Sequence, residues 1–284
     1  MNLDIAENYL FQVTPSQEDE ARQLIVKKHE AALARKAKNG SKQRVFADLT
    51  HERSLLERGA RLVAGMDEVG RGALAGPVVV GVCVVDTATV DPPLGLTDSK
   101  LIATDLRDAY VPLIRGWARD HAVGSASADE IDELGIIGAL RVAGQRALAS
   151  VEARIGPVDT VLLDGSHDWL TEPEQDLFSL MEGPTHAPVT GYTQPRVVTR
   201  VKADIACAAV SGASVLAKVA RDRLMTELDR EFPQFGWATN KGYGSSGHNL
   251  ALATGGPVRY HRRSWNLPIL AATTHEEKEG LGTL

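Results

Sequence analysis

The sequence feature that most constrains the fold is a valine-rich run without charge, VVVGVCVV, at residues 78–85. Gly76-Pro77 precedes the run and Asp86 follows it, so its ends are marked by residues typical of turns. The run has no alternation of apolar and polar positions, which predicts a strand buried on both faces. Such a strand needs a layer of packed structure on each side of its sheet.

Other segments supply the rest of an α/β domain, because strand-like and helix-like patterns are mixed along one chain. The fold class that we expect is α/β, with a central mixed sheet flanked by helices. The predicted strands are 61–70, 76–86, 159–165 and 196–204, and the predicted helices are 127–155 and 205–232.

Residues 1–60 differ from this pattern and are predicted to be a helical N-terminal extension. Residues 14–40 begin with acids and close with basic residues, the order that the helix dipole favours. The apolar stripe is thin, with Leu24, Ile25 and Leu33 as its larger members. We expect an exposed or loosely docked helix. Its basic end could contact nucleic acid, but a solvated helix is the favoured interpretation. The main domain is then 61–268, with a flexible tail at 269–284.

The bulk properties limit the class of protein only loosely. The net charge of −6 argues weakly against a nucleic-acid partner, but 183–203 and 232–275 contain no acid and could form a basic patch. An ordinary solvated surface would also explain these segments. No apolar run reaches the ~18 residues of a membrane span, and no heptads indicate an oligomer. Buried thiols at Cys83 and Cys207 fit a reducing compartment, so we expect a cytoplasmic protein. The small size and the lack of heptads make a monomer the default expectation.

Four acids interrupt apolar segments, where an unpaired carboxylate is costly. Asp67 and Glu68 follow LVAGM, Asp164 follows VLL, and Asp204 precedes IACAAV. Strand ends and a helix start could bring the four together at one edge of the sheet. Close carboxylates repel one another and favour a cation, and oxygen ligands favour Mg²⁺ or Mn²⁺. Such a cluster could hold two ions that act on a phosphodiester.

Each acid also has a simpler interpretation. Asp164 with Gly165 is a common turn pair, Asp204 could only cap a helix, and the pair Asp67-Glu68 could form a salt bridge with Arg71. The co-occurrence of all four favours the metal site. The glycine turn after the acids, GRGALAG at 70–76, lacks the spacing of a dinucleotide fingerprint and leads into a strand. Its glycines would let the backbone approach a ligand closely.

Six motifs in order give the chain a resemblance to the ribonuclease HII family over roughly residues 62–268. They are DEVGRG at 67–72, DSK at 98–100, VLLDG at 161–165, the segment from Lys202 to Met225, KGYGSSGH at 241–248 and HRRSW at 261–265. The resemblance implies a ribonuclease H-like fold. It also implies an endonuclease that hydrolyses the RNA strand of RNA–DNA hybrids and cuts 5′ to single ribonucleotides in duplex DNA, leaving a 3′-hydroxyl and a 5′-phosphate.

The resemblance also implies roles for residues. The catalytic and metal-binding set would be Asp67, Glu68, Asp164 and Asp204, holding two Mn²⁺ or Mg²⁺ ions, and no protein partner would be required. The substrate-binding set would be Gly70, Arg71, Gly72, Lys100, Lys218, Arg221 and Tyr243. The glycine backbone would read the 2′-hydroxyl, Tyr243 would stack on the next sugar, and the basic side chains would contact phosphates.

Several departures and alternatives accompany this assignment. Arg71 favours ribonuclease HII over the related HIII, whereas Leu101 and Ala203 replace residues that are common in the family. Two other functions fit the same fold: a module that binds hybrids without cutting, and a two-metal nuclease that acts on DNA alone. The complete acid set argues against the first. Gly70–Gly72 with Tyr243 argue against the second.

Overall fold

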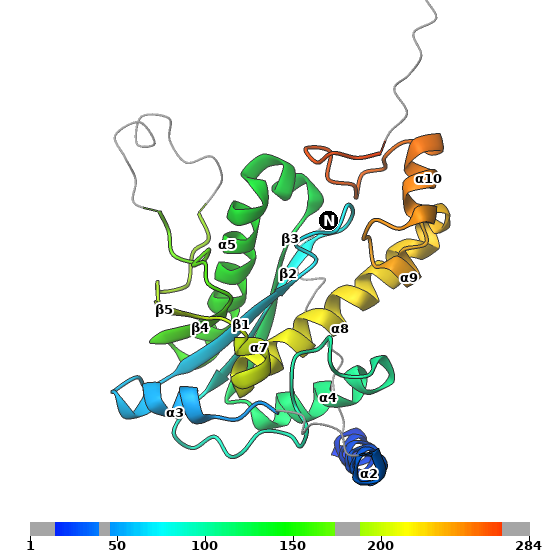
Figure 1. Ribbon diagram of the computed structural model, residues 1–284. Coiled ribbons are helices and arrows are strands. Elements are labelled where there is room, and N and C mark those ends of the chain that lie inside the picture. The colour runs from blue at the N-terminus through cyan, green and yellow to red at the C-terminus, as the bar shows by residue number, and fades with distance from the viewer. Residues whose placement is uncertain (1–14, 40–45, 174–187, 269–284) are drawn as a thin grey trace, which may run out of the picture.

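The computed structural model describes residues 15–39, 46–173 and 188–268, which build layers around a five-stranded sheet (Figure 1). The strand order is β3-β2-β1-β4-β5, in which β1 pairs antiparallel with β2 and parallel with β4. The predicted mixed sheet is therefore confirmed. The strands are β1 (Val63–Val69), β2 (Val78–Val85), β3 (Asp120–Ala126), β4 (Thr160–Asp164) and β5 (Arg196–Arg200).

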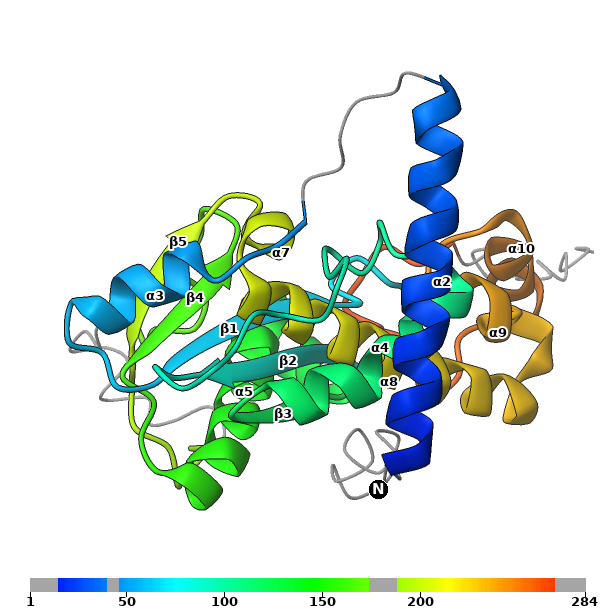
Figure 2. The ribbon, with the colours of Figure 1, turned by 90° about the horizontal axis from the view of Figure 1, so that it is seen from below.

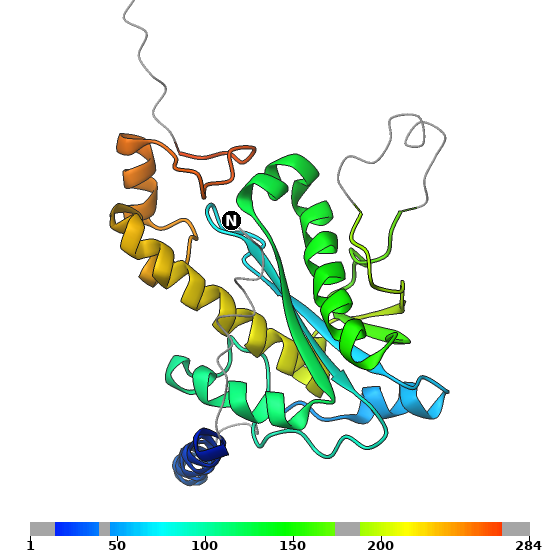
Figure 3. The same ribbon diagram turned by 180° about the vertical axis from the view of Figure 1, so that it is seen from behind.

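Helices cover both faces of this sheet, as the valine-rich run required. The eight residues of β2 are all buried. Helix α5 (Ala128–Ile155) packs on one face and helix α8 (Ala208–Glu231) on the other, which Figures 1 and 3 show from opposite sides. Ser127 caps α5, since its hydroxyl accepts from the N–H of Glu130 and the Glu130 carboxylate accepts from the N–H of Ser127.

The long helix predicted at 205–232 is broken near its start. Residues Ala203–Ala206 form a single turn, α7, and α8 begins only after an extended residue, Cys207. Helix α3 (Thr50–Glu57) and the residues just before it hold this junction. Asp48 forms a β-bridge with Cys207, and the buried carboxylate of Glu52, in α3, accepts the N–H of Ala209 at 2.8 Å. Asp204 therefore lies on a short turn that neighbouring backbone fixes.

Several elements have no clear sequence signal. Strand β3 reads DHAVGSA, with few β-branched residues, and pairing with β2 along its whole length overrides that weak propensity. The prediction for 196–204 was too long, because β5 ends at Arg200. The remaining elements are α4 (Thr104–Trp117), η1 (Pro233–Phe235), α9 (Trp237–Asn240) and α10 (Ser246–Gly255).

Helix α8 lies unusually close to the sheet because glycines face it. A Cβ on Gly65 would stand 2.2 Å from the backbone of Ala209, and one on Gly81 would stand 2.2 Å from the carbonyl oxygen of Ala213. Neither contact is possible for a real side chain, so both positions need glycine. This close approach sets the distance between β1, which carries Asp67, and the helix that follows Asp204.

The N-terminal helix α2 (Pro15–Asn39) packs on α4, as Figure 2 shows from below. The prediction of a helix at 14–40 is confirmed. Its contact is narrow: Ala21 and Ile25 are buried, and Lys28 forms an ion pair with Asp105 at 2.5 Å. Leu24, which we placed on the apolar stripe, is exposed. The tail at 269–284 lies outside the described residues, and none of the described helices is long and apolar enough to cross a membrane.

Candidate active site

Three of the four predicted acids meet where β1 and β4 end. These parallel strands are in register up to Met66 and Leu163, so Asp67 and Asp164 are the next residues on adjacent strands. The backbone N–H of Asp204, in α7, donates to Oδ1 of Asp164 at 3.3 Å. Two strand ends and the turn before α8 thus bring Asp67, Asp164 and Asp204 to one place.

Glu68 approaches this place from the other face of the sheet. Successive side chains of a strand point to opposite faces, and Gly65 faces α8 whereas Ala64 and Met66 belong to the core under α5. Asp67 therefore shares the α8 face and Glu68 does not. Glu68 forms an ion pair with Arg71 at 3.4 Å, the simpler role that the sequence also allowed. The charge of Glu68 still acts on Asp67, and the gathering of all four acids at one metal site stays a prediction.

Burial and mutual repulsion disfavour the charged forms of these acids. Burial, and then the charge of Glu68, raise the pKa of Asp67 to about 8, and its side chain is 6% exposed. Burial and the charge of Asp164 raise the pKa of Asp204 to about 6. Burial also raises the pKa of Glu68, against the opposing effect of Arg71. Among the described residues, no Lys or Arg forms an ion pair with Asp67, Asp164 or Asp204.

The charges of the acid cluster act on Lys100, for which the family resemblance implied a phosphate contact. Burial lowers the pKa of Lys100, but Asp98, Asp67 and other acids outweigh that effect, and the net pKa is raised. Its exposed ammonium group is therefore available to a phosphate at the edge of the acid cluster. Asp98 is a buried acid close to the cluster. The hydroxyl of Ser214, in α8, donates to the hydroxyl of Ser99, the residue after Asp98, at 2.9 Å.

The donor set fits a hard divalent cation in chemistry. It consists of carboxylate oxygens whose charges repel one another, and among the described residues only Glu68 of the four has a basic partner, so Mg²⁺ or Mn²⁺ would relieve the repulsion. Among residues 15–39, 46–173 and 188–268, no group of three or more acidic, histidine or cysteine side chains is already arranged so that it could hold a metal ion.

In the glycine turn after β1, the surroundings of Gly70 require glycine, whereas those of Gly72 do not. Gly70 has φ +86°, and a Cβ there would stand 2.1 Å from Nε of Arg221, so the fold itself requires glycine. Gly72 has no such constraint, because a Cβ there would meet nothing within 4 Å. The open space over Gly72 is what a ligand approaching the backbone would need.

Tyr243 lies next to this loop, because the carbonyl of Gly242 accepts the N–H groups of Leu74 and Ala75 at 2.8 and 3.2 Å. The tyrosine ring is 37% exposed, and the guanidinium of Arg221 lies 5.5 Å from its centroid. The loop and Tyr243 thus form one continuous surface beside the acids.

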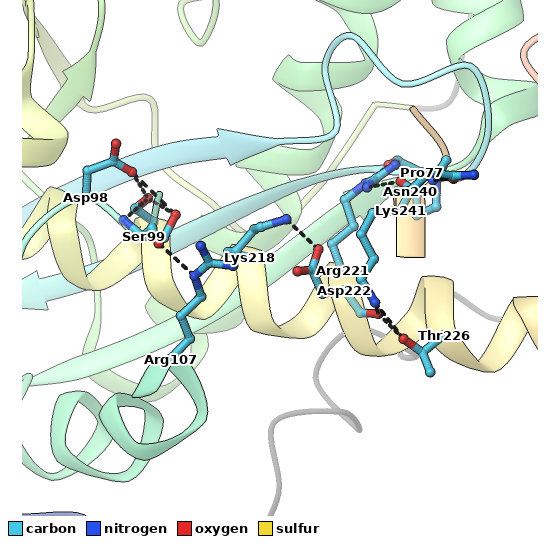
Figure 4. Close-up of polar contacts among 12 residues, drawn as sticks. Pro77, Asp98, Ser99, Arg107, Lys218, Arg221, Asp222, Thr226, Asn240 and Lys241 are labelled. Carbon is cyan, nitrogen blue, oxygen red and sulfur yellow. Dashed lines mark hydrogen bonds and ion pairs between the residues drawn. The ribbon is translucent and has the colours of Figure 1, made fainter. Parts of the chain in front are cut away.

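Arg221 itself does not reach that surface. Its side chain is fully buried, and it donates to the carbonyls of Pro77, Lys241 and Ala75 at 2.9, 2.7 and 3.1 Å (Figure 4). The prediction of a phosphate contact at Arg221 was wrong, because a guanidinium with these partners faces the protein interior. Lys218 is accessible but forms an ion pair with Asp222 at 2.6 Å along α8, also seen in Figure 4, so a phosphate would have to replace that partner.

Two buried histidines support the Tyr243 segment from behind. The N–H of Val258 donates to Nδ1 of His261, so the proton of His261 is on Nε2, which lies 3.0 Å from Nε2 of His248. Nε2 of His248 therefore accepts this hydrogen bond. The proton of His248 is on Nδ1, which donates to the carbonyl of Tyr243 at 2.9 Å. Both rings are therefore neutral, and the network leaves no acceptor for another proton.

This network predicts acid sensitivity. Burial lowers the pKa of His261 to about 4 and also lowers that of His248, whereas both titrate near 6.5 when unfolded. The unfolded chain then binds more protons below pH 6.5, so stability falls as the pH drops, by about 1.4 kcal/mol per pH unit for His261 between pH 6.5 and 4, and His248 acts in the same direction. Urea unfolding at pH 7.5 and 5.0 measures this effect. H261Q should reduce the pH dependence, and an unchanged slope would contradict the assignment.

Sequence reasoning missed Asp98, Ser214, His248, His261 and Arg262 as contributors to this region. All five stand in recognised motifs, namely DSK, the segment from Lys202 to Met225, KGYGSSGH and HRRSW, but the motifs did not indicate a role for the individual side chains. Arg262 donates to backbone carbonyls distant in sequence, Ser214 contacts the distant hydroxyl of Ser99, and the two histidines contact each other across 13 residues. A sequence pattern does not show such contacts.

The comparisons with known proteins identify the family to which the chain is similar. The model of the family described as Ribonuclease HII matches residues 64–267. Curated proteins named Ribonuclease HII from Streptomyces avermitilis and Syntrophotalea carbinolica are 45% and 40% identical over 217 and 222 residues. Each match covers 76% of this chain, and they cover 82% and 91% of the two relatives.

Solved structures give the same result for the fold. Ribonuclease H2 from Pyrococcus horikoshii OT3 has 26% identity and a TM-score of 0.52, covering 73% of this chain and 95% of that one. RNase HII of Archaeoglobus fulgidus, solved in a complex with PCNA, has 27% identity and a TM-score of 0.51, covering 72% and 96%. Bst-RNase HIII with Mn²⁺ shares the fold at 19% identity and a TM-score of 0.51, over 74% of this chain and 68% of that one.

Proposed function

The chain belongs to the ribonuclease HII family, and on that basis we propose that it cuts duplex DNA on the 5′ side of a single embedded ribonucleotide. Proteins of this family are endonucleases that hydrolyse RNA in RNA–DNA hybrids. The proposed products are a 3′-hydroxyl and a 5′-phosphate. The observation that carries the proposal is that the acid pair and the Gly70–Gly72 loop occupy one continuous segment, with the open backbone at Gly72 five residues after Asp67.

The acids would hold the metal. Asp67, Asp164 and Asp204 share the α8 face, and Glu68 would join them from the other side of β1. When bound, two Mg²⁺ or Mn²⁺ ions would neutralise charge on the scissile phosphate and lower the pKa of a water molecule, so that it attacks as hydroxide after losing a proton. Lys100, beside the acids, would hold the neighbouring phosphate.

The glycine loop and Tyr243 would select the cleavage position. A 2′-hydroxyl both donates and accepts, so the exposed backbone at Arg71 and Gly72 could recognise it. The ring of Tyr243 lies beside this loop and over Arg221, where it would pack on the following sugar and favour one without a hydroxyl.

Incision of a duplex carrying one ribonucleotide tests the proposal, with Mg²⁺ and Mn²⁺ each supplied. The wild type should cut at the 5′ side of the ribonucleotide and leave the all-deoxy duplex intact. Y243A should lose about tenfold in preference for the ribo–deoxy junction over a continuous hybrid, the order of one lost stacking contact. Y243F keeps the ring and serves as the matched control. Absence of incision with both metals would refute the proposed function, and full preference in Y243A would remove Tyr243 from it.

A further inference from the structure

Arg262 is a fully buried arginine that no motif assignment explains. Its side chain is 0% exposed and lies under the glycine turn of residues 70–76. Nη2 donates to the carbonyls of Gly70 and Gly76 at 2.6 and 3.1 Å, Nη1 donates to that of Arg71 at 2.9 Å, and Nε donates to Gly76 at 3.2 Å. The four hydrogen bonds thus converge on three carbonyl groups of this one turn.

No carboxylate of the described residues forms an ion pair with this guanidinium. Asp132, the acid that most affects it, accepts instead from the backbone of Arg263 and Ser264 at 2.8 and 2.9 Å. Burial lowers the pKa of Arg262 to about 9, so it remains charged at neutral pH. A buried charge without an ion pair is costly, and here the carbonyl dipoles of the turn stabilise it.

The consequence for the turn is a fixed direction for two peptide planes. In a trans peptide the C=O of one residue and the N–H of the next point in opposite directions. Arg262 holds the carbonyls of Gly70 and Arg71, so the N–H groups of Arg71 and Gly72 point away from it. Neither N–H donates to a group among the described residues, and the space beside Gly72 is open.

We infer that Arg262 is a positioning residue for ribose recognition, because it holds the carbonyl side of the Gly70–Gly72 backbone and presents the N–H groups of Arg71 and Gly72 to a 2′-hydroxyl. The inference rests on the proposed function. Arg262 touches no substrate in this account. Its buried charge also polarises the two peptides that it contacts, which strengthens their N–H groups as donors.

Binding measured without catalysis separates this role from general stability. Wild type and R262K are titrated, with Ca²⁺ in place of the catalytic metal, against a duplex with one ribonucleotide and against the same duplex in all-deoxy form. Lysine keeps the charge but cannot reach three carbonyls in one plane. The ratio of ribo to deoxy affinity should fall about tenfold in R262K, the scale of a lost hydrogen bond pair, while all-deoxy affinity stays unchanged.

L148A is the control for loss of stability. Leu148 is a fully buried residue of α5, which packs on the face of the sheet away from α8, and its truncation should leave the affinity ratio at the wild-type value. A wild-type ratio in R262K, or an equal fall of the ratio in L148A, would overturn the inference. A wild type that neither prefers the ribonucleotide nor cuts it would instead refute the proposed function.

A measurement on the wild-type protein keeps the inference testable if R262K does not fold. The amide hydrogens of Arg71 and Gly72 should exchange rapidly in the free protein and become protected by the ribonucleotide duplex. The all-deoxy duplex should leave them unprotected. Equal protection by both duplexes, or protection in the free protein, would show that these N–H groups are not the presented donors.

Discussion

Replacing Asp67 with asparagine is expected to reduce the incision rate by on the order of 10³-fold, the scale of losing a preorganised charged group at a reacting phosphate. Asparagine has the same size but carries no charge to hold a divalent ion. The free energy of unfolding without metal should not fall, because the charge removed is buried and repelled by Glu68 and Asp164. Loss of activity with retained stability would identify a residue that serves the reaction at the expense of the fold.

Single-turnover incision and urea unfolding of D67N test both parts. D86N is the matched control, because Asp86 follows β2 at the opposite end of the neighbouring strand and its oxygen accepts from Ala88 and Thr89. Asparagine preserves those acceptor contacts, so D86N should retain full activity. Wild-type activity in D67N would exclude Asp67 from the metal site, whatever its effect on stability.

Replacing Gly65 with alanine is expected to destabilise the protein by about 3 kcal/mol, the upper range for overpacking a close-packed core. The new methyl group would stand 2.2 Å from the backbone of Ala209 and Val210, so α8 must move away from β1. That movement also separates Asp67 from Asp204. Activity per folded molecule should therefore fall as well.

Chemical denaturation of G65A measures the stability loss, and the incision rate under stabilising conditions measures the displacement of α8. G247A is the control, because Gly247 lies in α10, has no positive φ and would place its Cβ more than 4 Å from any neighbour. It should be neutral or slightly stabilising, since alanine favours a helix. Equal stability of G65A and wild type would mean that α8 does not pack as closely as described.

The acids could be predicted as site residues from the sequence, because a charged side chain is costly within an apolar segment. Asp67, Asp164 and Asp204 each interrupt an apolar segment, and the structure brings these three together. The different approach of Glu68 follows from strand alternation, which is also visible in the sequence once β1 is recognised. The family resemblance grouped the four acids without that distinction.

The arginines could not be interpreted in the same way. Arg221 and Arg262 stand in basic motifs, where an exposed phosphate contact is the ordinary expectation. Their actual partners are backbone carbonyls of a turn far away in the sequence, and every residue type offers the same carbonyl. The strand β3 escaped prediction for a related reason, since the tertiary pairing with β2 outweighs its local preference.

The position of Arg262 also has a consequence for synthesis. It is 192 residues away from Gly70 along the chain, and Lys241 and Gly242 are also supplied late. A growing chain that has released β1, β4 and α7 contains all four acids before the residues that brace the glycine turn have left the ribosome. Because chains emerge N-terminus first, the ability to hold metal can precede the ability to choose a sugar. The proposed selectivity for a ribonucleotide would therefore be the last property that the nascent chain acquires.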